Sequence, residues 1–155
     1  MPTMEFLFRL DQTVNMHGEK TTEMVLRKVA DKVAERAGLD LVDFSVYPNV
    51  DHHPARYEYL FEFYHADHAA IDLAELSRIT DEELRAGNYD VDYMTEDGTF
   101  APAIARVLQD ETNQLWRDMR VMHGKAPNQI KPVHIIDTEQ KRRFFFALID
   151  GEIEG

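Results

Sequence analysis

Two short clusters of histidine and aspartate are the first candidates for chemistry in this chain of 155 residues. The clusters Asp51-His52-His53 and His65-x-Asp67-His68 offer four imidazoles and two carboxylates, ligand types that suit zinc and other transition metals. If residues 55–64 form one strand, the clusters lie at its opposite ends, about 30 Å apart. We therefore interpret them as two polar loop ends and expect no metal site.

The patterns of several common catalytic sites are absent from the sequence. No serine stands in Gly-x-Ser-x-Gly, and without cysteine there is no thiolate nucleophile, no cysteine zinc site and no disulfide framework. Neither a Gly-x-x-x-x-Gly-Lys-Ser/Thr loop nor a Ser/Thr/Gly-rich run of the adenylating type is present to cradle phosphates. We therefore expect the chain alone to hold no nucleotide cofactor and to catalyse no adenylation.

Composition and charge restrict the class of protein. The length suits one globular domain over residues 1–155, and 44% of the residues are hydrophobic. The 17 Lys and Arg residues face 29 Asp and Glu residues, so the formal charge of -12 argues against partners such as nucleic acids and anionic lipid surfaces. No apolar run reaches the ~18–20 residues of a membrane span, and the N-terminus lacks the features of a signal peptide. These observations predict a cytoplasmic protein with no membrane partner.

The first half of the chain predicts a hairpin, a helix and a strand pair. Residues 1–18 are expected to form a short hinge-like hairpin, with strands at 6–8 and 13–14, before an α+β sandwich over 19–155. Thr21 or Thr22 is expected to cap a helix that ends at Gly38. Alternating apolar residues predict strands over 41–46 and 57–63, paired antiparallel across a loop at 48–54.

The second half predicts further helices and strands. We expect a helix over 69–76, a short helix opened by a capping box at Thr80, and a strand over 89–94. A long helix is expected from Thr99 to Gly124, followed by strands over 133–136 and 144–149. Together these elements predict an α+β fold, with helices packed on a mixed sheet and a short β-hairpin in front of it.

Short motifs follow one another along nearly the whole chain: Phe8-Arg9-Leu10-Asp11, Glu19-Lys20-Thr21, Asp43-Phe44-Ser45, Pro54-Ala55-Arg56-Tyr57, Leu84 with Asn88-Tyr89, Gly98-Thr99-Phe100 and Asn128-Gln129-Ile130-Lys131-Pro132. In order and approximate spacing they resemble the C-terminal domain of the auxin-responsive acyl-acid amido synthetases, which belong to the acyl-adenylate-forming superfamily. Three departures stand out. The family usually has Pro-Gly-His-Tyr at residues 54–57, and its stretch corresponding to residues 100–127 is usually shorter. In addition, Pro132 follows Lys131 directly, without the usual Pro-Arg spacing of the family.

The resemblance implies a two-step reaction with ATP. A carboxylic acid attacks ATP to form an acyl-adenylate, and the nitrogen of an amino acid then displaces AMP to form an amide. In this family a large domain holds the nucleotide and the acyl group, while the small C-terminal domain swings over the site and presents a lysine. ATP and AMP are therefore expected only in a complex with a large adenylation domain as partner.

The resemblance also implies roles for four residues. Lys131 is the best match to the catalytic lysine, whose ammonium would stabilise negative charge on the α-phosphate during displacement. Lys20 is a second candidate for a nucleotide or phosphate contact, and Arg9 and Asp11 match hinge residues of the superfamily. The alternative is a stand-alone protein-interaction or regulatory module of the same fold, without catalytic activity.

Overall fold

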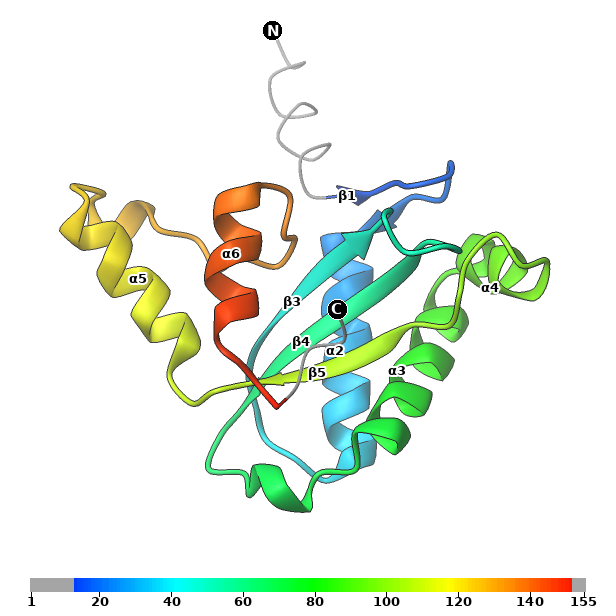
Figure 1. Ribbon diagram of the computed structural model, residues 1–155, viewed down its shortest axis with the longest axis horizontal. Coiled ribbons are helices and arrows are strands. Elements are labelled where there is room, and N and C mark those ends of the chain that lie inside the picture. The colour runs from blue at the N-terminus through cyan, green and yellow to red at the C-terminus, as the bar shows by residue number, and fades with distance from the viewer. Residues whose placement is uncertain (1–12, 152–155) are drawn as a thin grey trace, which may run out of the picture.

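A mixed sheet of four strands forms the centre of the protein, of which a computed structural model describes residues 13–151 (Figure 1). The strands lie in the order β3 (Leu41–Asn49), β4 (Arg56–Phe63), β5 (Ile104–Leu108) and β6 (Ile149–Asp150). β4 pairs antiparallel with β3 and parallel with β5, and β6 pairs antiparallel with β5. The predicted α+β fold with a mixed sheet and the predicted antiparallel pair are therefore confirmed.

A small hairpin precedes the first described helix. β1 (Thr13–Val14) pairs antiparallel with β2 (Thr21–Thr22), and Gly18, at φ 94°, lies in the turn between them. The expected strand at 13–14 is present. The other expected strand, at 6–8, and the hinge candidates Arg9 and Asp11 lie outside the described residues.

Three helices cover one face of the sheet and its edge. α2 (Glu23–Ala37) passes behind the strands in Figure 1, and α3 (Leu73–Gly87) and α4 (Tyr89–Glu96) follow it at the right. The Thr22 side chain accepts a hydrogen bond from the backbone N–H of Val25, and Gly38 ends α2 in the left-handed conformation at φ 71°. Both predicted ends of this helix are confirmed.

A row of stacked aromatic rings lies under these helices. Tyr59, Phe61 and Phe63 point from β4 towards α2 and α3, with ring centroids 5.4 and 5.5 Å apart, and Tyr57 continues the row. Each of the four side chains is at most 1% exposed. The period-2 pattern in the sequence thus marked both the strand and its core face correctly.

The opposite face of the sheet is also covered. Leu60 of β4 packs in a second core with residues of α5 (Thr112–Met122), α6 (Glu139–Ala147) and the segment between them, which includes η2 (Pro127–Gln129). These helices stand at the left of Figure 1. Glu58 and Glu62, which alternate with the aromatic residues, are 0% and 4% exposed. β4 is therefore buried on both faces.

Several predicted elements of the second half are wrong. Residues 89–94 belong to helix α4, and Thr80 lies inside α3, which starts at Leu73 after the capping residue Asp72. The long helix from Thr99 to Gly124 is instead β5 followed by α5. Parallel pairing with the buried strand β4 overrides the helical spacing of apolar residues, and Glu111, at φ 65°, interrupts any helical path into α5.

The remaining corrections concern helix positions and the C-terminal strands. The helix expected at 69–76 is η1 (His68–Ala70) followed by the first turn of α3. Residues 133–136 contribute one isolated bridge, between Ile135 and Val46, and most of 144–149 lies in α6. Within residues 13–151, no helix is long and apolar enough to cross a lipid bilayer.

The buried carboxylate of Glu62 fixes the start of α5. It accepts hydrogen bonds from the backbone N–H groups of Glu111 and Asn113, at 3.1 and 2.9 Å, and from the Asn113 side chain at 2.6 Å. The first N–H groups of a helix have no partner within the helix, and a negative charge there is favourable. A side chain of the central strand therefore serves as the cap of a helix on the second face.

Glu62→Gln is expected to lower the free energy of unfolding by about 1–3 kcal/mol, because the amide cannot accept from all three donors. Chemical denaturation measures the loss, and amide hydrogen exchange should be faster in the first turn of α5. Glu111→Gln removes the same charge from an exposed neighbour and should leave stability within about 0.5 kcal/mol of the parent. Equal losses in the two variants would contradict the capping role.

Candidate functional site

Lys131 lies in an extended segment beside the free edge of β3. The backbone N–H of Val46 donates to the carbonyl of His134 at 2.9 Å, and the N–H of Ile136 donates to the carbonyl of Val46 at 2.8 Å. Ile130 and Val133, on either side of Lys131 and Pro132, are buried in the second core. The backbone of Lys131 is thus held between two buried anchors while its side chain faces solvent.

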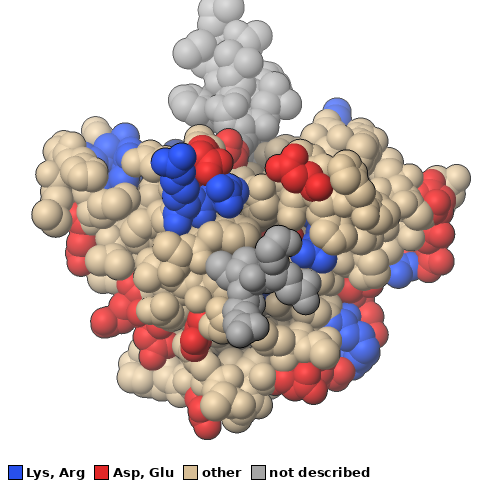
Figure 2. Space-filling model, in the orientation of Figure 1, with Lys and Arg blue, Asp and Glu red and all other residues tan. Residues whose placement is uncertain are grey.

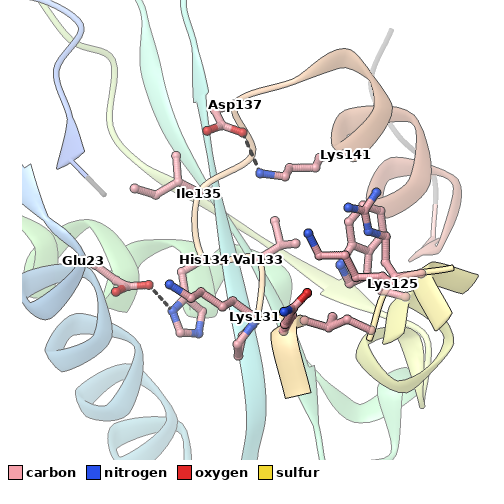
Figure 3. A pocket seen from close by; sticks show the side chains of 13 residues that line it. Glu23, Lys125, Lys131, Val133, His134, Ile135, Asp137 and Lys141 are labelled. Atoms are coloured by element: carbon pink, nitrogen blue, oxygen red, sulfur yellow. Dashed lines mark hydrogen bonds and ion pairs between the residues drawn. The ribbon is translucent and has the colours of Figure 1, made fainter. Parts of the chain in front are cut away.

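A cavity of about 610 Å³ opens beside this segment. Four cationic side chains line it: Arg120 from α5, Lys125 from the turn after α5, Lys131, and Lys141 from α6. Figure 3 shows Lys125, Lys131 and Lys141 around the same hollow. We call this site the basic cavity.

The basic cavity contrasts with the charge of the rest of the chain. Figure 2 shows Lys and Arg side chains gathered over α5 and α6, whereas Asp and Glu side chains dominate the lower part of the same face. In the sequence, no acidic residue occurs between Asp118 and Asp137. Asp137 pairs with Lys141 at 2.8 Å, and the Arg120 guanidinium lies 5.6 Å from the Trp116 ring centroid.

His134 forms one side of the basic cavity and is clamped between two carboxylates. Its Nδ1 lies 2.7 Å from Glu23 Oε2 on α2, and its Nε2 lies 2.9 Å from Asp43 Oδ1 on β3. The ring stacks on Phe44, with centroids 4.4 Å apart. A neutral imidazole has one N–H, so only the protonated ring donates both hydrogen bonds.

The surroundings of His134 favour this protonated form. Burial alone would lower the pKa of His134, but the hydrogen bonds to Asp43 and Glu23 outweigh it and raise the pKa above its ordinary value. The guanidinium of Arg27 also faces Asp43, at 3.9 Å. The clamp joins α2 and β3 to the segment that carries Lys131.

A second cavity, of about 320 Å³, adjoins the basic cavity and has a mixed lining. The two share Trp116, Lys131 and Pro132, and the second is lined by Arg117 as well as by Asp43, Glu62 and Glu111. Two of these carboxylates are already engaged, Asp43 by His134 and Glu62 by the start of α5. Lys131 therefore lies at the boundary between the two hollows.

Lys20 does not line the basic cavity. It is exposed between β1 and β2, and its backbone carbonyl accepts a hydrogen bond from the Asn88 side chain at 3.2 Å. The structure thus separates the two predicted lysines, and only Lys131 joins a cluster of cations.

The motif around Lys20 builds a buried hydrogen-bond chain. The Asn88 amide donates to Thr21 Oγ1 at 2.9 Å, and Thr21 lies 2.8 Å from the Tyr57 hydroxyl. The Tyr57 hydroxyl donates to Glu19 Oε2 at 2.7 Å, so Thr21 is the donor to Tyr57. Burial and the bond to Glu19 raise the pKa of Tyr57. Several motif residues thus join the hairpin, β4 and α4.

Glu19 is the end point of this chain. Its carboxylate is 0% exposed and also accepts from the backbone N–H groups of Met16 and His17, at 3.0 and 2.8 Å. A buried carboxylate needs such partners. These hydrogen bonds leave the Glu19 carboxylate no free position for a substrate. The motif therefore stabilises the fold.

The sequence analysis missed Arg120, Lys125 and Lys141 as site residues. Arg120 fell in the stretch assigned to one long helix and Lys125 in the loop after it, which gave no reason to place either near Lys131. The available signal was the absence of Asp and Glu between residues 118 and 137 in so acidic a chain. In residues 13–151, no group of three or more His, Cys, Asp or Glu side chains is arranged to hold a metal ion.

Comparison with known proteins identifies relatives of this domain. A family model described as the GH3 family C-terminal domain matches residues 21–140. A solved structure, "GH3.15 acyl acid amido synthetase", aligns with a TM-score of 0.74 at 18% identity, covering 90% of this chain and 26% of that one. A second, "AtGH3.15 acyl acid amido synthetase in complex with 2,4-DB", gives the same TM-score and coverage at 16% identity. No curated protein matches the sequence.

The family match and the structural alignments both cover most of this chain. The matched residues run from β2 into the first turn of α6 and include Lys131. At these identities the solved structures establish the shared fold. The chain spans about a quarter of the length of the synthetases that it matches.

Tyr57→Phe is expected to lower the free energy of unfolding by about 1–3 kcal/mol, because it leaves Glu19 and Thr21 with an unfilled buried hydrogen bond. Urea denaturation measures the change. Tyr64→Phe alters an exposed tyrosine next to the same strand and should change stability by less than about 0.5 kcal/mol. A Tyr57→Phe variant as stable as the parent would contradict the structural role of the motif.

His134→Gln should be destabilising in a way that depends on pH. Because the pKa of His134 is raised in the folded state, its stabilising contribution is complete below about pH 6.5, the ordinary value, and is lost as the pH rises through the raised value. The stability difference between parent and variant should therefore be largest near pH 6 and shrink towards pH 9. His53→Gln, at an exposed histidine, is the control. A difference that is the same at all pH values would contradict the clamp.

Proposed function

Because this chain belongs to the GH3 family, in which it corresponds to the C-terminal domain, we propose that it acts as a mobile lid for ATP-dependent amide formation. It does so with a large adenylation domain, on the same chain or in trans. The observation that carries the proposal is the position of Lys131. The lysine of the Asn128-Gln129-Ile130-Lys131 motif is exposed, sits on a fixed backbone and borders a cationic cavity.

The proposed chemistry has two steps. A carboxylate oxygen of the acid attacks the α-phosphorus of ATP, the bond from that phosphorus to the bridging oxygen breaks, and pyrophosphate leaves. An amine nitrogen then attacks the acyl carbon, the bond to the AMP oxygen breaks, and the nitrogen loses a proton. The large domain supplies the acyl pocket and most nucleotide contacts.

Lys131 contributes to the first step in this proposal. Negative charge grows on the oxygens around the α-phosphorus as pyrophosphate departs, and a compact ammonium placed there stabilises the transition state.

Lys20 and the N-terminal segment have subsidiary roles in the proposal. Lys20 is exposed on the hairpin and is available for a nucleotide phosphate held by the large domain. Arg9 and Asp11 precede β1 in the sequence, as expected for hinge residues between the two domains. A reaction that consumes ATP suits a cytoplasmic protein.

Lys131→Ala should lower adenylation by about 10²–10³-fold in the assembled enzyme, the usual effect of removing one preorganised donor. Exchange of labelled pyrophosphate into ATP, with the cognate acid and the large domain present, measures this step. Lys20→Ala should have a smaller effect.

Lys28→Ala is the matched control, because Lys28 is an exposed lysine of α2 that does not line the basic cavity. It should leave exchange unchanged. Unchanged exchange in Lys131→Ala would remove this lysine from the mechanism. A large domain that works equally well without this chain would contradict the lid role itself.

A further inference from the structure

The basic cavity carries more positive charge than one catalytic lysine requires. Arg120 comes from α5, Lys125 and Lys131 from the loop after it and Lys141 from α6, and all four line the same hollow of about 610 Å³. Lys141 lies just beyond the residues that match the family model. One wall of the cavity therefore lies outside the residues that match the family.

The neighbouring carboxylates neutralise one of these four cations. Asp137 is paired with Lys141, and Glu23 faces the protonated ring of His134. Within residues 13–151, Arg120, Lys125 and Lys131 have no carboxylate at ion-pair distance. Three positive charges therefore remain around the cavity for a ligand to balance.

The arginines of α2 and α3 are paired with carboxylates instead. Arg36 bridges Glu82 and Glu83 at 2.9 and 2.8 Å, and Arg85 contacts Asp92 at 2.8 Å. A chain with a formal charge of -12 has ample carboxylates for such pairing. Unpaired cations that gather in one hollow are unexpected in so acidic a chain. Their presence favours an anionic ligand as the explanation.

The loop that carries Lys125 and Lys131 is held in place. Arg117 of α5 donates to the carbonyls of Ile130 and Pro127, each at 3.3 Å. This contact ties both ends of η2 to α5. The cations are therefore displayed from a supported loop, which lowers the entropy lost when a ligand binds.

The number of cations favours a condensed phosphate over a single anionic group. Lysine ammoniums act as compact point charges, and the arginine fork matches phosphate oxygens. A diphosphate or triphosphate spreads its charge over more than one phosphorus atom and can meet cations from several walls at once. A monophosphate or a carboxylate reaches fewer of them and must overcome the same repulsion from the acidic chain.

We propose that the basic cavity binds a condensed phosphate through Lys125, Lys141 and Arg120 together with Lys131. The anion is free pyrophosphate or the triphosphate tail of a nucleotide. The inference rests on the proposed function for the source of this anion, since adenylation consumes ATP and releases pyrophosphate. The binding itself is a property of this chain and needs no large domain.

Calorimetric titration of the full chain with inorganic pyrophosphate tests the proposal. We expect saturable binding with Kd of about 0.1–1 mM at low ionic strength, weakening as salt is added. Lys125→Gln should weaken binding about fivefold, and Lys125→Gln combined with Lys141→Gln more than about tenfold. Lys28→Gln removes the same charge outside the cavity and should leave binding unchanged. Both lysines are at least partly exposed, so the variants should fold like the parent.

Titrations with ATP, AMP and succinate separate the sources of the anion. Tighter binding of ATP than of pyrophosphate assigns the cavity to a nucleotide tail, and the reverse order assigns it to the free product. AMP and succinate should bind at least about tenfold more weakly than either.

Three results would overturn the proposal: no saturable binding at about 10 mM pyrophosphate, AMP or succinate binding as tightly as pyrophosphate, or an equal loss in Lys28→Gln. None of these titrations contains a large domain. A negative result here therefore leaves the exchange assay on Lys131 unaffected, and a failed exchange assay leaves the titration unaffected.

Discussion

Burial of both faces of β4 is the constraint on which the rest of the structure depends. One face carries the aromatic row, which is buried by packing under α2 and α3. The other face places Glu58 and Glu62 in the interior, where a carboxylate is costly unless hydrogen bonds and opposite charges surround it. Arg56, Arg106 and Asn49 hold Glu58 at 2.8–2.9 Å. Their hydrogen bonds outweigh the effect of burial and lower the pKa of Glu58. Glu62 accepts a hydrogen bond from the backbone N–H of Asn113 at the start of α5. The strand thus determines where α5 begins and, through Arg117, where the loop with Lys131 lies.

The segment after this loop connects the second core to the first. It follows the free edge of β3 with two backbone hydrogen bonds, and Ser45 donates a short hydrogen bond to the carbonyl of Val133. His134 then joins it to α2 and β3. Such an edge would otherwise expose unpaired backbone groups. The same contacts that protect the edge hold Lys131 at the boundary of the two hollows. A rigid support of this kind is what a lysine needs in order to act on a developing charge.

The sequence predicted the half of the fold whose local signals and burial agree. Alternation in β3 and β4 and the caps at Thr22 and Gly38 were sufficient for the strand pair and α2. The prediction for Thr99 to Gly124 was wrong because the apolar spacing there suits a helix, whereas pairing with the buried β4 makes part of the stretch a strand. For the site, the family resemblance indicated Lys131, and the structure added Arg120, Lys125 and Lys141. Their meeting depends on the true position of α5, which Glu62 sets from a distant strand and which no local pattern reveals. The structural role of Glu19 was likewise not predictable from local sequence. Its motif lies beside the candidate Lys20, but its buried carboxylate accepts a hydrogen bond from Tyr57 of β4.

In our account the basic cavity binds phosphate groups, and Lys131 is one of the lysines that contact them. Labelling with an acyl phosphate of ATP tests this most directly, because the probe transfers its acyl group to lysines beside its bound phosphate tail. Peptide mapping by mass spectrometry then identifies the lysines that react. Our account predicts preferential acylation of Lys131 and Lys125, suppressed by excess pyrophosphate, with Lys28 at background level. Labelling spread evenly over exposed lysines, or unaffected by pyrophosphate, would contradict it.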